Sequence, residues 1–347
     1  MKDIIELNYS ISIKKRPNSG IEILKTILTF LILVYHCINP SISDNKILRI
    51  LIQIVPFYFS TFFIIHFYFI YNTFSSRNIT IIKQRFLRIL IPYICWPFVF
   101  VFIHIISYDK KIKLNNVFRD LFIQLIIGRR IYYIFWFQFN LLIISLLFAI
   151  FMLALKKKYI NYFIIVFIIS YILEYFGFVE NFFEKYNEDL KRSVGRILKM
   201  MIFSITGFFL SSIKMLNHLK QYKMKSIFIS FFVFLIIVYL KIYLSNYYFL
   251  EGIFLDLGAV CLMITFALIP LDKITNMSII FLMKQITSYT AGVYYIHLKV
   301  HIYFEDNIII FKNGSLRGCA LNYLICYSIC FIGMKLFGKT KLKYLFI

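Results

Sequence analysis

The chain has 347 residues, of which 61% are hydrophobic, 20% aromatic and only 16% charged. Soluble domains are roughly half apolar and about a quarter charged, so this composition excludes a soluble globular protein, a disulfide-stapled secreted domain and a disordered chain. The formal net charge of +23 is spread over short basic clusters between apolar runs, which is typical of membrane-protein loops and not of a nucleic-acid-binding surface. We therefore predict an all-α polytopic membrane protein, with membrane lipids as partners and no nucleic acid.

Apolar runs long enough to cross a bilayer, about 20 residues each, occur repeatedly between residues 21 and 338. Ten such runs are predicted to be transmembrane helices: 21–38, 51–71, 89–107, 133–155, 159–178, 197–213, 226–245, 252–270, 279–300 and 318–338. The apolar stretch 118–127 is too short to span, so we expect it to be interfacial or re-entrant. Because no linker or soluble appendage separates the runs, residues 1–347 are predicted to form a single membrane-embedded domain.

The basic residues indicate an orientation in the membrane. If ten spans alternate, five basic clusters fall on one side, at 14–16, 77–88, 156–158, 214–225 and 339–343. Cytoplasmic loops carry an excess of Lys and Arg, so both termini are expected to be cytoplasmic. The polar first twenty residues and the lack of a small-residue cleavage motif argue against a cleaved signal peptide.

The first span carries ionisable residues, which are expensive in a membrane and therefore candidates for function. Lys25 and His36 are eleven residues apart, close to a whole number of helical turns, so they share one face and lie roughly 16 Å apart along the axis. Glu22 precedes Lys25 by three residues and can pair with it. A cation at one leaflet and an imidazole towards the other suit a reaction that holds an anion on one side and moves a proton on the other. The alternatives are a lysine that extends to the lipid headgroups and a hydrogen-bonded interfacial histidine.

These residues resemble a known family. Asn18 to Lys25, continued to Tyr35-His36, is similar to the first helix of the acyltransferase-3 family, in which an acidic residue is followed by Arg or Lys, ten residues and His. The resemblance continues in three later stretches, Arg85-Phe86-Leu87-Arg88 with Ile91-Pro92-Tyr93, Phe135-Trp136-Phe137, and Thr290 to His297. One departure stands in the second span, where the family usually has Ser-Gly and this chain has His66-Phe67.

The resemblance implies an integral membrane acyltransferase of the kind that O-acetylates bacterial surface glycans. The expected reaction moves an acetyl or similar acyl group from cytosolic acetyl-CoA to a hydroxyl of a cell-surface or lipid-linked glycan. The expected location is the bacterial inner membrane.

The chemistry of the candidate residues fits this reaction. Lys25, Arg85 and Arg88 are predicted to bind the phosphates of the acyl donor, because guanidinium forks match phosphate oxygens. His36 is predicted to act as general base or to carry the acyl group itself, since imidazole titrates near neutral pH, and Glu22 is the second candidate catalytic residue.

Further residues are candidates for binding the glycan or for structural roles. Trp136 and His297 are predicted to contact the acceptor, with an interfacial aromatic belt as the alternative for Trp136. His297 and His301 have the i,i+4 spacing of metal ligands but no third ligand in their motif, so we expect no metal. His66 and His104 lie alone on apolar faces and are expected to be hydrogen-bonded structural residues.

Two other functions stay open at this point. Multiple spans with buried histidines also suit a transporter or flippase for lipid-linked sugars, although the Pro residues do not recur at matching positions of two halves. A glycan polymerase that holds lipid-linked sugars through Arg119, Arg129 and Arg130 is the other alternative, but it leaves the spacing on the first helix unexplained. The oligomeric state cannot be predicted.

Overall fold

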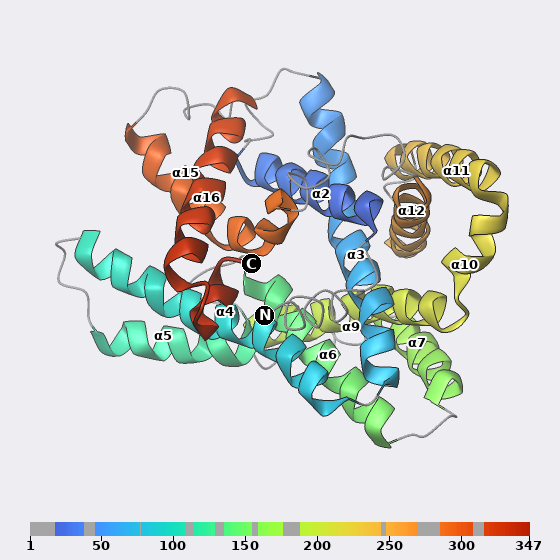
Figure 1. Ribbon diagram of the computed structural model, residues 1–347, viewed down its shortest axis with the longest axis horizontal. Coiled ribbons are helices and arrows are strands. Elements are labelled where there is room, and N and C mark those ends of the chain that lie inside the picture. Colours follow the sequence, from blue (N-terminus) through green and yellow to red (C-terminus); the bar gives the residue numbers. More distant parts are fainter. Residues whose placement is uncertain are drawn as a thin grey trace, which may run out of the picture.

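The structure is a computed structural model that describes residues 18–37, 46–76, 78–107, 114–128, 135–154, 159–175, 188–243, 248–269, 285–307 and 316–347. Every regular element within these ranges is helical. Figure 1 shows the helices arranged around α2 (Ser19–Cys37) and α3 (Lys46–Ser75), which lie near the middle of the molecule. The prediction of an all-α fold is therefore confirmed.

Within the described ranges, eight helical segments are long and apolar enough to cross a membrane, which agrees with a polytopic membrane protein. The eight lie in α2, α3, α4 (Ile79–Ser107), α6 (Phe135–Ala154), α9 (Glu188–Ser212), α10 (Met215–Leu219) continued by α11 (Lys223–Tyr243), α12 (Tyr248–Leu268) and α16 (Leu316–Phe337). Two further predicted spans correspond to α7 (Tyr159–Tyr175), which has only 17 residues, and to α15 (Thr290–Asn307), which carries several charged and polar side chains. The described helices thus follow the predicted order of apolar runs.

The short apolar stretch after the third span forms α5 (Leu114–Ile127), a helix of 14 residues. At 1.5 Å per residue it is roughly 21 Å long, too short to cross a bilayer, as predicted. It packs against α4, where the Tyr93 hydroxyl donates hydrogen bonds to the carbonyls of Gln124 and Leu125, each 2.9 Å away.

The start of α2 is fixed by a side-chain cap. Asn18 Oδ1 accepts a hydrogen bond from the Ile21 amide at 3.2 Å, which satisfies one of the unpaired donors of the first turn. The Asn18 amide nitrogen in turn donates to the carbonyl of Ala267 in α12, 2.7 Å away. Because α2 also packs on α3, α15 and α16, one helix is held from four sides and its register is defined at its first residue.

The C-terminal segment returns into the bundle instead of leaving it. A short 3₁₀ helix, η3 (Lys341–Leu345), packs against α4, and Trp96 Nε1 donates a hydrogen bond to the Leu345 carbonyl at 3.1 Å. In Figure 1 the C-terminus accordingly lies near the centre of the view, beside α4 and α16. This places Tyr344 under the guanidinium of Arg88, 5.9 Å from the ring centroid.

The α3–α9 pair is the most extensive helix contact in the described chain, and a glycine permits its close approach. A Cβ built on Gly207 of α9 would lie 2.3 Å from the Ile64 carbonyl oxygen and 2.8 Å from the Ile64 Cα, both backbone atoms of α3. A side chain at this position therefore requires the two helices to separate.

We predict that Gly207→Ala destabilises the protein by about 1–3 kcal/mol, as overpacked cores do. Gly195 lies on the same helix with nothing within 4 Å of its Cβ position, so Gly195→Ala should be neutral or stabilising by up to about 1 kcal/mol through helix propensity. Thermal unfolding of both variants in detergent checks this. Equal melting temperatures for the two variants would contradict the close contact of α3 and α9.

Candidate functional site

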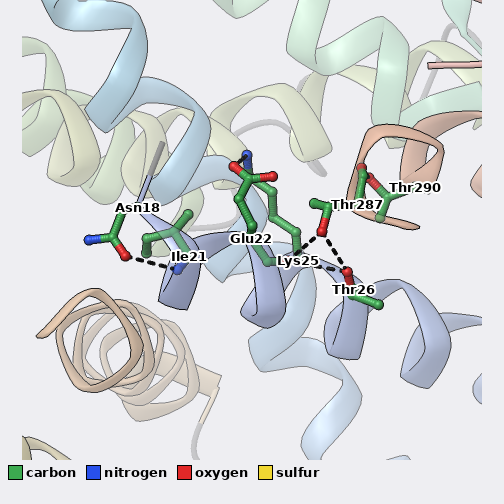
Figure 2. Close-up of polar contacts among 7 residues, drawn as sticks. All are labelled: Asn18, Ile21, Glu22, Lys25, Thr26, Thr287 and Thr290. Carbon is green, nitrogen blue, oxygen red and sulfur yellow. Dashed lines mark hydrogen bonds and ion pairs between the residues drawn. The ribbon is translucent and has the colours of Figure 1, made fainter. Parts of the chain in front are cut away.

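One end of α2 carries an ion pair. Lys25 Nζ lies 3.1 Å from Glu22 Oε1, one helical turn earlier, and both side chains are largely shielded from solvent. Figure 2 shows the two side chains projecting together from one face of α2. The predicted pairing of Glu22 with Lys25 is therefore confirmed.

The same turn of α2 is bound to the segment that leads into α15. Thr287 Oγ1 donates to the Glu22 carbonyl at 3.1 Å and lies 3.0 Å from Thr26 Oγ1, whose own hydroxyl also bonds the Glu22 carbonyl. Figure 2 shows these hydroxyls meeting beside the Glu22–Lys25 pair. The contact fixes how α15 is placed along α2.

A group of cations gathers near this end of α2, and we call Lys25, Arg85 and Arg88 the cation cluster. His66 of α3 interacts electrostatically with both Lys25 of α2 and Arg85 of α4, and Arg85 interacts with Arg88, so two helices contribute cations to one region. Arg85 is half-buried, whereas Arg88 is exposed. His66 is also hydrogen-bonded, with its Nε2 3.3 Å from Ser145 Oγ of α6.

Two imidazoles meet at the other end of α2. The rings of His36 and His297 have centroids 5.3 Å apart and are tilted by 38°, and we call these residues the histidine pair. His297 is 1% exposed, and His36 is intermediate. Thr26 to His36 and Thr287 to His297 are both ten residues, so the two contacts between these segments are equally spaced along each.

The proton on His297 is assigned by its hydrogen bond. His297 Nδ1 lies 2.6 Å from the carbonyl oxygen of Tyr294, and because a carbonyl can only accept, Nδ1 carries the hydrogen. Nε2 is then the nitrogen with the lone pair. It is buried and has no hydrogen-bond partner among the described residues. A buried acceptor of this kind is suited to a hydroxyl or N–H donor.

Asn322 of α16 is hydrogen-bonded to both segments that carry the histidine pair. Its side-chain nitrogen donates to the His297 carbonyl at 3.1 Å and lies 3.4 Å from the sulfur of Cys37, the residue after His36. Its oxygen accepts from the Cys326 thiol at 3.1 Å. A single fully buried amide thus connects α2, α15 and α16 at the level of the two imidazoles.

Trp136, which the sequence predicts to contact the acceptor, lies inside the bundle. Its ring is buried, with the Arg196 guanidinium 5.0 Å from one ring centroid and the Phe59 ring at 5.3 Å. A series of ring contacts leads from Trp136 through Phe137 and Tyr294 to His297.

Most of the predicted site residues therefore form two groups, one beside each end of α2. Lys25, Glu22 and Arg85 lie at its first turns, and His36 and His297 lie at its last turn. Glu22 and His36 are fourteen residues apart, roughly 21 Å along the axis, so the structure does not bring the two candidate catalytic residues together.

Two polar residues of the bundle, Asp256 and Asn322, were not found from the sequence. Asp256 of α12 accepts a hydrogen bond from Thr206 of α9 at 2.9 Å, and its other oxygen is buried without a hydrogen-bond partner in the described chain. Its position as a lone acid within an apolar run was a signal that an intramembrane carboxylate is present. Gln138 bonds the Tyr295 hydroxyl and the Ile89 carbonyl. No sequence signal marks Asn322, because two of its partners, His297 and Cys37, lie on other helices.

Among the residues that the structure describes, no group of three or more His, Cys, Asp or Glu side chains is placed to hold a metal ion.

The fold and this arrangement define a helical membrane protein with ionisable groups at both ends of one buried helix. Residues 18–344 match the acyltransferase-3 family, described as an acyltransferase domain, and the chain belongs to this family. It is therefore a membrane acyltransferase. Neither curated proteins nor solved structures gave a significant match.

We predict that Asn322→Leu lowers the rate of acyl transfer about tenfold, because a lost buried hydrogen bond of 1–2 kcal/mol misplaces the histidine pair. Leu has the branched shape of Asn but is larger and makes no hydrogen bonds, so the melting temperature should fall as well, and the rate is therefore compared per folded molecule. Asn217 is exposed in α10, and Asn217→Leu is the matched control that should keep full activity. An unchanged rate in Asn322→Leu, or a rate that falls only in proportion to folded protein, would contradict this role.

Proposed function

We propose that the protein transfers an acetyl or similar acyl group from cytosolic acyl-CoA to a hydroxyl of a cell-surface or lipid-linked glycan. The observation that carries the proposal is the division of α2 into a cationic end and an imidazole end. The donor is a polyanion with a thioester at the end of a flexible arm, and the acceptor needs a base at its hydroxyl. Each end of α2 suits one of these requirements.

The separation along α2 supports this division of roles. Lys25 and His36 are eleven residues apart on one continuous helix, which is roughly 16 Å. The pantetheine arm between the phosphates and the sulfur of coenzyme A is a chain of peptide-like and methylene units that extends about 18 Å. Phosphates held by the cation cluster therefore allow the thioester to reach the histidine pair.

The proposed chemical step uses His36 as general base. Its imidazole takes the proton of the glycan hydroxyl while the oxygen attacks the thioester carbonyl carbon. The carbon–sulfur bond then breaks, and the proton passes to the leaving thiolate, so that the products are the ester and free coenzyme A. Direct transfer of this kind needs no acyl-enzyme intermediate, and an acyl-His36 relay is the alternative.

His297 is proposed to position the acceptor. Its Nε2 lone pair is buried beside His36 and lacks a partner in the described chain, so it can accept a hydrogen bond from a sugar hydroxyl. A site built to bond a hydroxyl discriminates strongly against molecules that lack one.

The proposed location is the inner membrane of a bacterium with both termini in the cytoplasm. The basic clusters support this orientation, which places the Lys25 end of α2 towards the cytosol, where acyl-CoA is made, and the His36 end towards the outer surface.

We predict that His36→Ala abolishes the acyl esters on the glycan, because general-base catalysis contributes about 10²–10⁴-fold. The measurement is mass spectrometry of surface glycans from cells with the gene, without it, and with each variant. His218 is exposed in α10, and His218→Ala is the matched control that should keep the esters. If the esters persist in His36→Ala cells that contain normal membrane levels of the protein, the assignment of His36 as general base is contradicted. Transport of glycan in vesicles without acyl-CoA would favour a flippase instead.

A further inference from the structure

The residues that follow α16 turn back and are anchored in the bundle (Figure 1), and we call Thr340 to Ile347 the returning segment. Leu345 and Phe346 are each 9% exposed, and Trp96 Nε1 of α4 donates a hydrogen bond to the Leu345 carbonyl at 3.1 Å. The Phe346 ring lies edge-on to Trp96, with centroids 6.2 Å apart, and stacks on Phe337 of α16 at 5.9 Å. The returning segment is therefore part of the packed structure.

Two glycines leave room for this anchor. A Cβ built on Gly333 of α16 would lie 2.4 Å from Cε1 of the Phe346 ring, and one built on Gly292 of α15 would lie 2.8 Å from the Phe346 carbonyl oxygen. A side chain at either glycine would displace Phe346, because a close-packed core has no space to absorb it. The surfaces of α15 and α16 are thus shaped to hold the returning segment against α4.

The returning segment brings one aromatic ring to the cation cluster. Arg88 Cζ of α4 lies 5.9 Å from the centroid of the Tyr344 ring, and Lys343 Nζ lies 5.6 Å from the same centroid. Within about 6 Å, a cation is attracted by the negative face of an aromatic ring. In the described part of the chain no carboxylate forms an ion pair with Arg88. The Tyr344 ring is therefore the contact that restrains the Arg88 guanidinium.

We propose that Tyr344 is a positioning residue for Arg88 and thereby raises the affinity of the enzyme for its acyl donor. Arg88 is exposed, and an arginine that is free to sample many rotamers loses that freedom when its guanidinium binds phosphate. A ring held in place by the buried anchor at Leu345 and Phe346 restricts the guanidinium before the donor arrives. This role rests on the proposed function, in which the cation cluster binds the donor's phosphates.

The test is binding of coenzyme A to the purified full-length protein in detergent. Tyr344→Leu removes the ring but keeps the anchor at Leu345 and Phe346, so we expect about three- to fivefold weaker binding, the worth of an exposed cation–π contact. Tyr344→Phe keeps the ring and should restore the affinity of the wild type. Tyr222 is 65% exposed in η1 (Lys220–Tyr222), and Tyr222→Leu is the matched control that should bind as the wild type does.

A double-mutant cycle measures whether Tyr344 acts through Arg88. Arg88→Gln removes the charge, and in that background Tyr344→Leu should cause no further loss of coenzyme A affinity. Steady-state kinetics give a second readout. Tyr344→Leu should raise KM for acyl-CoA about three- to fivefold, with kcat and KM for the glycan within about twofold of the wild type, whereas a merely structural role would lower kcat as well.

The outcomes separate this inference from the proposed function. If Arg88→Gln weakens coenzyme A binding and Tyr344→Leu does not, the role of Tyr344 is overturned and the proposed function stands. Losses that add in the double variant, or an equal loss in Tyr344→Phe and Tyr344→Leu, also overturn the role of Tyr344. If the wild type binds no coenzyme A, the proposed donor is wrong, and the inference is overturned with it.

Discussion

The cost of holding ionisable side chains within a membrane bundle is the constraint on which the rest of the structure depends. On α2 this cost is lowered by the Glu22–Lys25 ion pair at one end and by the ring contact of His36 with His297 at the other. The hydrogen bonds of Asn18 and Thr287 keep α2 in register with α12 and α15, so both ends are set by one rigid helix. A shift of α2 along its axis by one turn would break the Thr26–Thr287 and His36–His297 contacts together.

In the proposed reaction, this arrangement gives the donor and the acceptor separate places. The cation cluster draws on α2 and α4, whereas the histidine pair joins α2 and α15 and is supported by Asn322 from α16. Because α2 belongs to both, it sets the distance between the proposed phosphate-binding site and the proposed site of acyl transfer. The proposal thus depends on one membrane-spanning helix, with the remaining helices supplying partners at its two ends.

Much of the fold follows from the sequence, and so does part of the site. Apolar runs predicted the order of the helices, and the spacing of Lys25 and His36 predicted a shared face. The contacts that bring His297 and Asn322 to the His36 end of α2 were not predictable. Helical periodicity within one segment does not show which other segment packs against that helix. Trp136 was predicted to contact the acceptor, with an aromatic belt as the alternative, and the sequence could not show that its ring is buried beside Arg196. His66 was read as a hydrogen-bonded structural histidine, and its Nε2 does lie 3.3 Å from Ser145 Oγ, but the sequence could not show that this partner is on α6.

The most direct test of this account is an experimental structure of the protein in a lipid bilayer with a non-hydrolysable acetyl-CoA analogue. The account predicts that the phosphates lie among Lys25, Arg85 and Arg88 and that the carbonyl of the acyl group lies beside His36 and His297. Phosphates bound away from α2, or an imidazole of His36 turned to the lipid while the acyl group lies elsewhere, would contradict it.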